Sequence, residues 1–243
     1  MKAIIIAAGH GSRLLPLTLE TPKCLVPVGG RAILDHQLRA IEAAGIEAVT
    51  VVGGYRIEQI GEHLAARPEN GSGGGLTTEL VFNPFWAVGS SIGSVWAARA
   101  ALTGAFVLMN GDTIFDPAVL AAAVTDARRG VKLVVDRLDA AEQDDMLVAV
   151  VDGRVRAVGK GLDPGRATHR SLGIVASTGG GAYADALRAV IGGDNGIHAF
   201  HHAVVDRLAG VDAVAAVVIP AGTPWQEIDR PDDIERWRRE RGS

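Results

Sequence analysis

The first half of the chain alternates short apolar runs with amphipathic segments. Nearly continuous apolar runs bounded by glycine or polar residues predict buried strands at 2–7, 48–52, 78–82 and 105–109. Apolar positions at helical spacing predict helices at 32–44, 57–65 and 94–102. Strands that alternate with helices of this length indicate βαβ units, and therefore a mostly parallel sheet with right-handed crossovers.

The pattern changes after about residue 130. Apolar runs at 131–135, 146–151 and 154–158 lie too close together for crossover helices, and Asp152-Gly153 between the last two is a hairpin signal. The remaining expected elements are strands at 172–176, 213–219 and 225–228 and helices near 182–191, 199–208 and 231–239. No composition break separates the halves. We therefore expect one α/β domain over 1–243, with a regular part at 1–130 and a smaller antiparallel part at 131–243.

Composition narrows the class of protein. The 31 glycines among 243 residues exceed the usual share of about 7%, which predicts tight turns or close approaches of backbone to a ligand. A net charge of −4 argues against a nucleic-acid partner, and a single cysteine excludes an internal disulfide. No apolar stretch reaches the roughly 20 residues of a membrane span. We expect a soluble, cytoplasmic protein, with residues 68–75 (PENGSGGG) as a flexible surface loop.

A glycine-rich loop follows the first predicted strand. Gly9 and Gly11 let the backbone pass close to a ligand and offer N–H donors to phosphate oxygens. Arg13 adds a planar, bidentate donor, and Lys23 adds a compact positive charge ten residues later. The spacing matches neither the Walker loop nor G-x-G-x-x-G, since position 14 is leucine. The plain alternative is a glycine turn that carries two surface cations.

This loop resembles the signature of the NTP-transferase (pyrophosphorylase) family, G-x-G-x-R followed by P-x-T-x-x-x-P-K. The chain keeps Gly9, Gly11, Arg13, Pro16, Thr18, Pro22 and Lys23. Three further blocks follow in the family's order, at 51–55 (VVGGY), 110–112 (NGD) and 225–229 (WQEID). The resemblance covers about 1–235 and implies a Rossmann-like, three-layer α/β/α nucleotidyltransferase fold. In this family an acceptor phosphate oxygen attacks the α-phosphate of a nucleoside triphosphate, and pyrophosphate leaves.

The resemblance also implies roles for single residues. Arg13 would hold the triphosphate, and Lys23 would stabilise charge on the α-phosphoryl group. Asp112 and Asp229 would share Mg²⁺, the implied cofactor, although either aspartate taken alone is more typical of a turn or a cap than of a metal ligand. The residues implied to bind the nucleotide are Ala7, Ala8, Gly9, Gly11, Ser90, Ser91, Ser94 and Gly111. Ser90 would equally cap a helix.

Two blocks indicate a branch of the family. Residues 83–94 (NPFWAVGSSIGS) and 142–148 (EQDDMLV) resemble the corresponding segments of CTP:phosphocholine and CTP:2-aminoethylphosphonate cytidylyltransferases. The resemblance therefore implies transfer of a cytidylyl group from CTP to a small phosphate or phosphonate acceptor, similar to phosphocholine, aminoethylphosphonate or a polyol phosphate. A homodimer is left open.

Lys160 resembles the lysine that grips the acceptor's phosphate, although a solvated lysine at a strand end is the simpler interpretation. Alternation along a strand places Trp225, Glu227 and Asp229 on one face. With Asp144 or Asp145 nearby, the ring and the carboxylates would form a site for a cationic acceptor. Alternatively, Trp225 belongs to the core and Glu227 to a local salt bridge.

Arg170 departs from this branch, because it stands where the cytidylyltransferases tend to carry glutamate. A positive charge there disfavours a cationic acceptor, so a sugar-1-phosphate nucleotidyltransferase using UTP, dTTP or GTP is the alternative. A metal-dependent glycosyltransferase would need Asp-x-Asp, which Asp112-Thr113-Ile114 lacks. The intact cations and aspartates argue against a non-catalytic nucleotide sensor. We expect His201-His202 to form an ordinary helix face.

Overall fold

The computed structural model describes residues 1–67, 75–142 and 144–241, so most of the loop expected at 68–75 lies outside the described residues. The main strands are β1 (Lys2–Ile6), β4 (Ala48–Gly53), β5 (Thr77–Phe82), β6 (Phe106–Asn110), β8 (Val131–Arg137), β9 (Leu147–Val151), β10 (Arg154–Gly159), β11 (His169–Ser177) and β12 (Val214–Val218). They form one sheet in the order β5-β4-β1-β6-β11-β8-β12-β10-β9.

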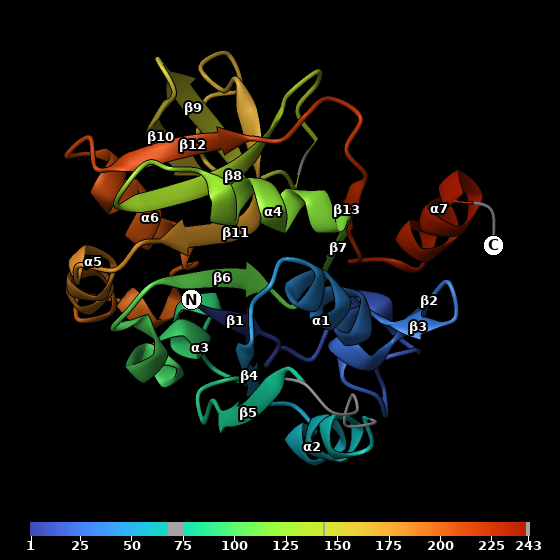
Figure 1. Ribbon diagram of the computed structural model, residues 1–243. Helices are drawn as coiled ribbons and strands as arrows, with labels where there is room; N and C mark the ends of the chain where they lie inside the picture. Colours follow the sequence, from blue (N-terminus) through green and yellow to red (C-terminus); the bar gives the residue numbers. More distant parts are fainter. Residues whose placement is uncertain (68–74, 143, 242–243) are drawn as a thin grey trace.

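Helices cover both faces of this sheet (Figure 1). They are α1 (Ile33–Ala43), α2 (Ile57–Ala65), α3 (Ser91–Ala97), α4 (Pro117–Thr125), α5 (Ala182–Ile191), α6 (His202–Ala209) and α7 (Pro231–Arg241). Alternation along β1 sends Ala3 and Ile5 into a core shared with α1, α2 and α4, while Ile4 and Ile6 enter a core shared with α3, α5 and α6. The predicted three-layer α/β/α fold is confirmed.

The strands of the second half curl back on themselves. β11 runs antiparallel to both β6 and β8, and its first residues also pair with β9. Because β8 pairs with β12, β12 with β10 and β10 with β9, these five strands close into a ring. The predicted hairpin at Asp152-Gly153 is confirmed, with both residues at positive φ, as a tight two-residue turn requires.

Several elements differ from the sequence-based expectation. β7 (Thr113–Phe115) and α4 were not predicted; α4 (PAVLAAAVT) has almost no polar face to mark a helical period, and Asp116 caps its start. α3 begins at Ser91 rather than at 94, and 3-10 turns form Arg99–Leu102 and Gly196–His198. α6 therefore begins at His202 rather than at 199.

A third, smaller apolar cluster joins the two ends of the chain. Its members are Leu14, Val26, Val28, Ile33, Ile114, Ile228, Ile234 and Trp237. They come from the glycine-rich loop, the small ribbon β2 (Pro27–Val28)–β3 (Arg31–Ala32), α1, the ribbon β7–β13 (Trp225–Glu227) and α7. This packing brings the loop that carries Lys23 beside the segment that carries Asp229. Among the described residues, no helix is long and apolar enough to cross a membrane.

Candidate active site

A cleft of about 450 Å³ opens where β1 and β6 end, the edge at which open α/β sheets bind ligands. Among the residues predicted for the site, those that line it are Ala8, Gly9, Gly11, Arg13, Ser90, Ser91, Ser94, Gly111, Asp112, Asp144, Lys160, Glu227 and Asp229. Segments more than 200 residues apart in sequence thus contribute to one cavity.

Gly111 allows β6 to turn tightly against β1 at the floor of the cleft. Its backbone N–H donates to the Ile6 carbonyl oxygen at 2.9 Å. A Cβ atom at position 111 would lie 2.7 Å from the Ala7 Cβ, too close for any larger residue. Ala7 therefore lies under the floor and supports Gly111, rather than lining the cleft.

The glycine-rich loop is held by contacts within the signature itself. Gly11 has a φ of +69°, which favours glycine, and a Cβ atom there would lie 2.8 Å from the Lys23 Cβ. The buried Thr18 hydroxyl donates to the Gly11 carbonyl oxygen at 2.8 Å. These contacts fix the side of the loop from which Lys23 extends.

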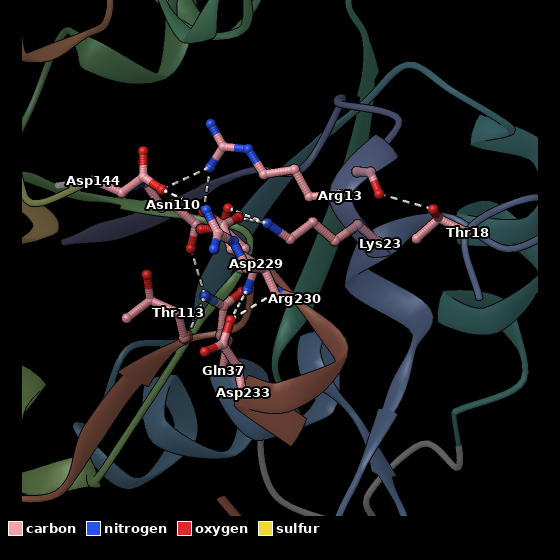
Figure 2. Close-up of polar contacts among 12 residues, drawn as sticks. Arg13, Thr18, Lys23, Gln37, Asn110, Thr113, Asp144, Asp229, Arg230 and Asp233 are labelled. Atoms are coloured by element: carbon pink, nitrogen blue, oxygen red, sulfur yellow. Dashed lines mark hydrogen bonds and ion pairs between the residues drawn. The ribbon is translucent and has the colours of Figure 1, made fainter. Parts of the chain in front are cut away.

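Arg13 and Lys23 both extend toward Asp229 (Figure 2). The Lys23 Nζ donates to the Asp112 Oδ2 at 2.8 Å and also to the Asp229 Oδ1. The Arg13 guanidinium donates to the other Asp229 oxygen at 2.9 Å. Burial acts to lower the pKa of the Lys23 ammonium, but the two carboxylates outweigh it and raise the pKa above its ordinary value. Lys23 is not among the residues that line the cleft, but it is a positive charge held by Asp112 and Asp229, which do line it.

Three carboxylates meet beside Lys23. Oxygen atoms of Asp112, Glu227 and Asp229 lie within 4.8 Å of one another. The pKa of the Glu227 carboxyl is raised, first by desolvation and then by the negative charges of Asp112 and Asp229. Part of the Glu227 residue is nevertheless exposed to solvent. The Asp112 Oδ1 is buried and has no hydrogen-bond partner in the described part of the chain. Such oxygen atoms suit Mg²⁺, which binds one or two carboxylates together with phosphates and waters.

Gln37 of α1 positions the β6–β7 corner, and sequence reasoning missed it. Its side-chain amide donates to the carbonyl oxygens of Asn110 at 2.6 Å and Thr113 at 2.9 Å (Figure 2). These bonds hold the backbone on either side of Asp112. The sequence did contain a sign of this role, because Gln37 is a polar residue on the otherwise apolar face of the helix, between Leu34 and Ile41.

The three predicted serines are placed differently. The Ser94 hydroxyl is buried and accepts a hydrogen bond from the Asn83 side-chain amide at 3.1 Å. The Ser91 hydroxyl accepts one from the His201 backbone N–H at 2.9 Å. Ser90 is the residue before α3, but its side chain makes no capping hydrogen bond. All three line the cleft.

The residues predicted for the acceptor divide between two clefts. Asp145 and Trp225 line a second cleft of about 500 Å³, which shares Asp144, Glu227 and Asp229 with the first. Arg170 lies 5.1 Å from the centre of the Trp225 ring and 3.9 Å from an Asp145 oxygen. The expected cage of aromatic ring and free carboxylates is therefore not assembled, because a guanidinium of the chain itself already occupies it.

Asp144 lies among three cations. Its carboxylate is 3.2 Å from Arg230, 3.7 Å from Lys160 and 3.8 Å from Arg13. Lys160 also lies 5.4 Å from the centre of the Phe200 ring. Lys160 is thus at the cleft, as the resemblance implied, but paired with a carboxylate.

His201 and His202 correct the expectation of an ordinary helix face. Both are buried and line the cleft. In the sequence, these two histidines show no metal-ligand spacing with a carboxylate. Their place in the cleft is therefore visible only in the tertiary structure.

Two paired cations, a carboxylate cluster and a cleft at the carboxyl ends of parallel strands are together typical of a nucleotidyltransferase site. A model of the MobA-like NTP transferase domain matches residues 3–202, and the chain belongs to this family.

Three similar proteins illustrate the relationship. Over 241 residues (96% of this chain) the sequence is 30% identical to CMP-5'-(3-aminopropyl)phosphonate synthase of Streptomyces rubellomurinus, of which the match covers 37%. Over 64 residues (26% of this chain and 25% of the relative) it is 47% identical to CTP:phosphoglutamine cytidylyltransferase of Campylobacter jejuni. The matched segments thus make up little more than a third of the first relative and a quarter of the second. The solved inositol-1-phosphate CTP transferase of T. maritima shares the fold, with a TM-score of 0.79 at 20% identity over 98% of this chain and 96% of that one.

Proposed function

We propose that the protein transfers a cytidylyl group from CTP to a small phosphate or phosphonate acceptor and releases pyrophosphate. The observation that carries this proposal is the meeting of Lys23 and Arg13 with the Asp112–Asp229 pair at one end of the cleft. The two relatives described above, named for CMP and CTP chemistry, support cytidine as the base.

In the proposed reaction, an acceptor oxygen forms a bond to the α-phosphorus of CTP. The bond from this phosphorus to the oxygen that bridges the α- and β-phosphates breaks, and that oxygen leaves with pyrophosphate. Lys23 and Arg13 bind the phosphate oxygens and stabilise the charge that builds on them, exchanging their present carboxylate partners for phosphate. The backbone of Ala8 and Gly9 lines the cleft beside Gly111 and would form the floor beneath the base.

Asp112, Glu227 and Asp229 would hold Mg²⁺. When bound, the ion supplies positive charge that neutralises and orients the phosphate oxygens. Lys160 would hold the acceptor's phosphate. It follows the end of β10 and lines the same cleft, where it and Arg13 lie near different oxygen atoms of the Asp144 carboxylate.

A sugar-1-phosphate nucleotidyltransferase is the second candidate. The position of Arg170 favours it, because this guanidinium covers the Trp225 ring and so disfavours a cationic acceptor. The two candidates differ in the nucleotide and in the acceptor, not in the chemistry at the α-phosphate.

A matrix of nucleotides and acceptors tests the proposal. Pyrophosphate release would be measured with CTP, UTP, GTP and dTTP, each against phosphocholine, 2-aminoethylphosphonate, a polyol phosphate and a sugar 1-phosphate, with Mg²⁺ present. We expect turnover with CTP. Turnover confined to UTP, GTP or dTTP with the sugar phosphate would replace the first candidate by the second.

Asp229→Asn tests the metal site. The substitution removes one negative charge from the carboxylate cluster. We therefore expect the Mg²⁺ concentration for half-maximal activity to rise at least roughly tenfold, with activity partly restored at high Mg²⁺. Asp139→Asn, at an exposed aspartate outside both clefts, is the matched control. An unchanged Mg²⁺ titration of the Asp229 variant would contradict the assignment.

A further inference from the structure

A pair of buried histidines lies at the acceptor side of the cleft, and nothing in the proposed chemistry uses it. His201 is 1% exposed and His202 is 4% exposed, and their rings lie 4.1 Å apart. Both line the cleft together with Ser171 and the Lys160–Phe200 pair. The histidines therefore border the space next to the lysine proposed to hold the acceptor's phosphate.

The hydrogen bonds of this pair leave ring nitrogens unpaired. The His201 Nε2 lies 3.0 Å from the Asn110 side-chain oxygen, which can only accept, so the Nε2 carries the proton and the Nδ1 has a free lone pair. The His202 Nε2 lies 3.0 Å from the Ser171 hydroxyl, which also accepts from the Gly173 backbone N–H. Both Nδ1 atoms are buried and have no partner in the described part of the chain.

The pair is uncharged near neutral pH. Burial lowers the pKa of His201 to about 4, and burial and the neighbouring ring lower the pKa of His202 well below its ordinary value. Such rings exchange hydrogen bonds with hydroxyl and amide groups, but they do not neutralise an anion. Unpaired buried nitrogens cost free energy, which a ligand group would recover by bonding to them.

Near Lys160, the groups expected to attract a cationic acceptor already have cationic partners. Asp144 already lies within 4 Å of three cations. Arg170 covers the Trp225 ring, and Lys160 lies against the Phe200 ring. Glu227 belongs to the carboxylate cluster that suits a divalent ion. Asp144 and the rings of Trp225 and Phe200 thus already contact cations of the chain itself.

Accepting the proposed function, we propose that the acceptor is a phosphate or phosphonate whose body carries neutral hydroxyl or amide groups, and that His201 and His202 determine this specificity by hydrogen bonding to those groups. The two histidines are specificity-determining residues, while Lys160 holds the phosphate that all acceptors share.

A comparison of acceptors tests the inference in the wild-type protein. Transfer to glycerol phosphate, which carries neutral hydroxyls, is compared with transfer to phosphocholine, using whichever nucleotide gives turnover. We expect kcat/KM to be at least about tenfold higher for glycerol phosphate, since one neutral hydrogen bond is worth about that factor.

Variants of His202 assign the preference to the pair. His202→Phe keeps a ring but removes both nitrogens, so we expect KM for glycerol phosphate to rise about tenfold, with KM for the nucleotide unchanged. His202→Gln keeps a hydrogen-bonding group and restores part of the preference. His169→Phe is the matched control, because His169 is also buried but lies outside the cleft.

The outcomes separate this inference from the function on which it rests. A preference for phosphocholine, or an unchanged acceptor ratio in both His202 variants, would overturn the inference and leave cytidylyl transfer intact. Absence of transfer with every nucleotide and acceptor would overturn both. If circular dichroism shows His202→Phe to be unfolded, His202→Leu, which also lacks both ring nitrogens, takes its place, and an unchanged acceptor ratio in that variant overturns the inference.

Discussion

The two ends of the cleft are built from different chemistry. At the nucleotide end, Arg13 and Lys23 pair directly with Asp112 and Asp229. At the acceptor end, the lining near Lys160 includes the buried, uncharged side chains of His201 and His202. Under the proposed function, the first end would recognise charge, which every nucleoside triphosphate carries, whereas the second would offer hydrogen bonds that depend on the shape of one acceptor. Selectivity among acceptors would then belong to the second end.

Removal of Lys23 should have the largest effect. Lys23→Ala leaves Asp112 and Asp229 without their shared cation and leaves the α-phosphate without its stabilising charge. We expect kcat to fall by a factor corresponding to about 3–4 kcal/mol, measured as pyrophosphate release. Lys2→Ala removes a lysine from a more exposed ion pair and serves as control. Unchanged kcat would mean that charge at this end is not catalytic.

Filling the space at Gly111 should disturb the same end sterically. The new Cβ atom of Gly111→Ala would meet Ala7 and the Ile6 carbonyl oxygen at less than 3 Å. We expect a loss of up to about 3 kcal/mol in the free energy of unfolding, measured in urea, together with reduced activity. Gly161→Ala is the control, because a Cβ atom there meets nothing within 4 Å. Equal stability of the two variants would contradict the close packing.

The acceptor end should respond to acid through its histidines. The folded pKa of His201, about 4, lies below the ordinary value of 6.5, so below pH 6.5 the unfolded chain binds a proton that the folded chain does not. Stability is therefore full above pH 6.5 and falls as the pH drops toward 4, by about 2 kcal/mol between pH 7 and 5 from His201 alone. His201→Gln should show a shallower slope in urea unfolding at these pH values. An identical slope would mean that His201 does not contribute.

Asp144 should contribute least to stability. Its side chain and those of Arg13 and Arg230 are about half exposed, and solvent screens such ion pairs. We expect Asp144→Asn to change the free energy of unfolding by less than about 1 kcal/mol, measured in urea. A larger loss would show that the contacts among Asp144 and its three cations form a cooperative network.

The sequence was most informative where local pattern and local chemistry coincide. β1 and α2 were predicted to within a residue because their hydrophobic periods are clear, and Gly11, Thr18 and Lys23 contact one another within one short loop. It was least informative for α4, whose uniformly apolar segment carries no period. The roles of Gln37 and the histidine pair also escaped it, since their partners lie more than 30 residues away in sequence.

The sequence by itself determined the fold class, the glycine-rich loop and the family resemblance, because each depends on patterns and motifs among residues close together along the chain. Only the tertiary structure decided which of the predicted acceptor residues share a cleft. Arg170 of β11 lies against Trp225 of β13, and His201 lies against Asn110 of β6, although each pair is more than 50 residues apart in sequence. Contacts of this kind depend on side-chain packing between distant elements, and no spacing in the sequence encodes them.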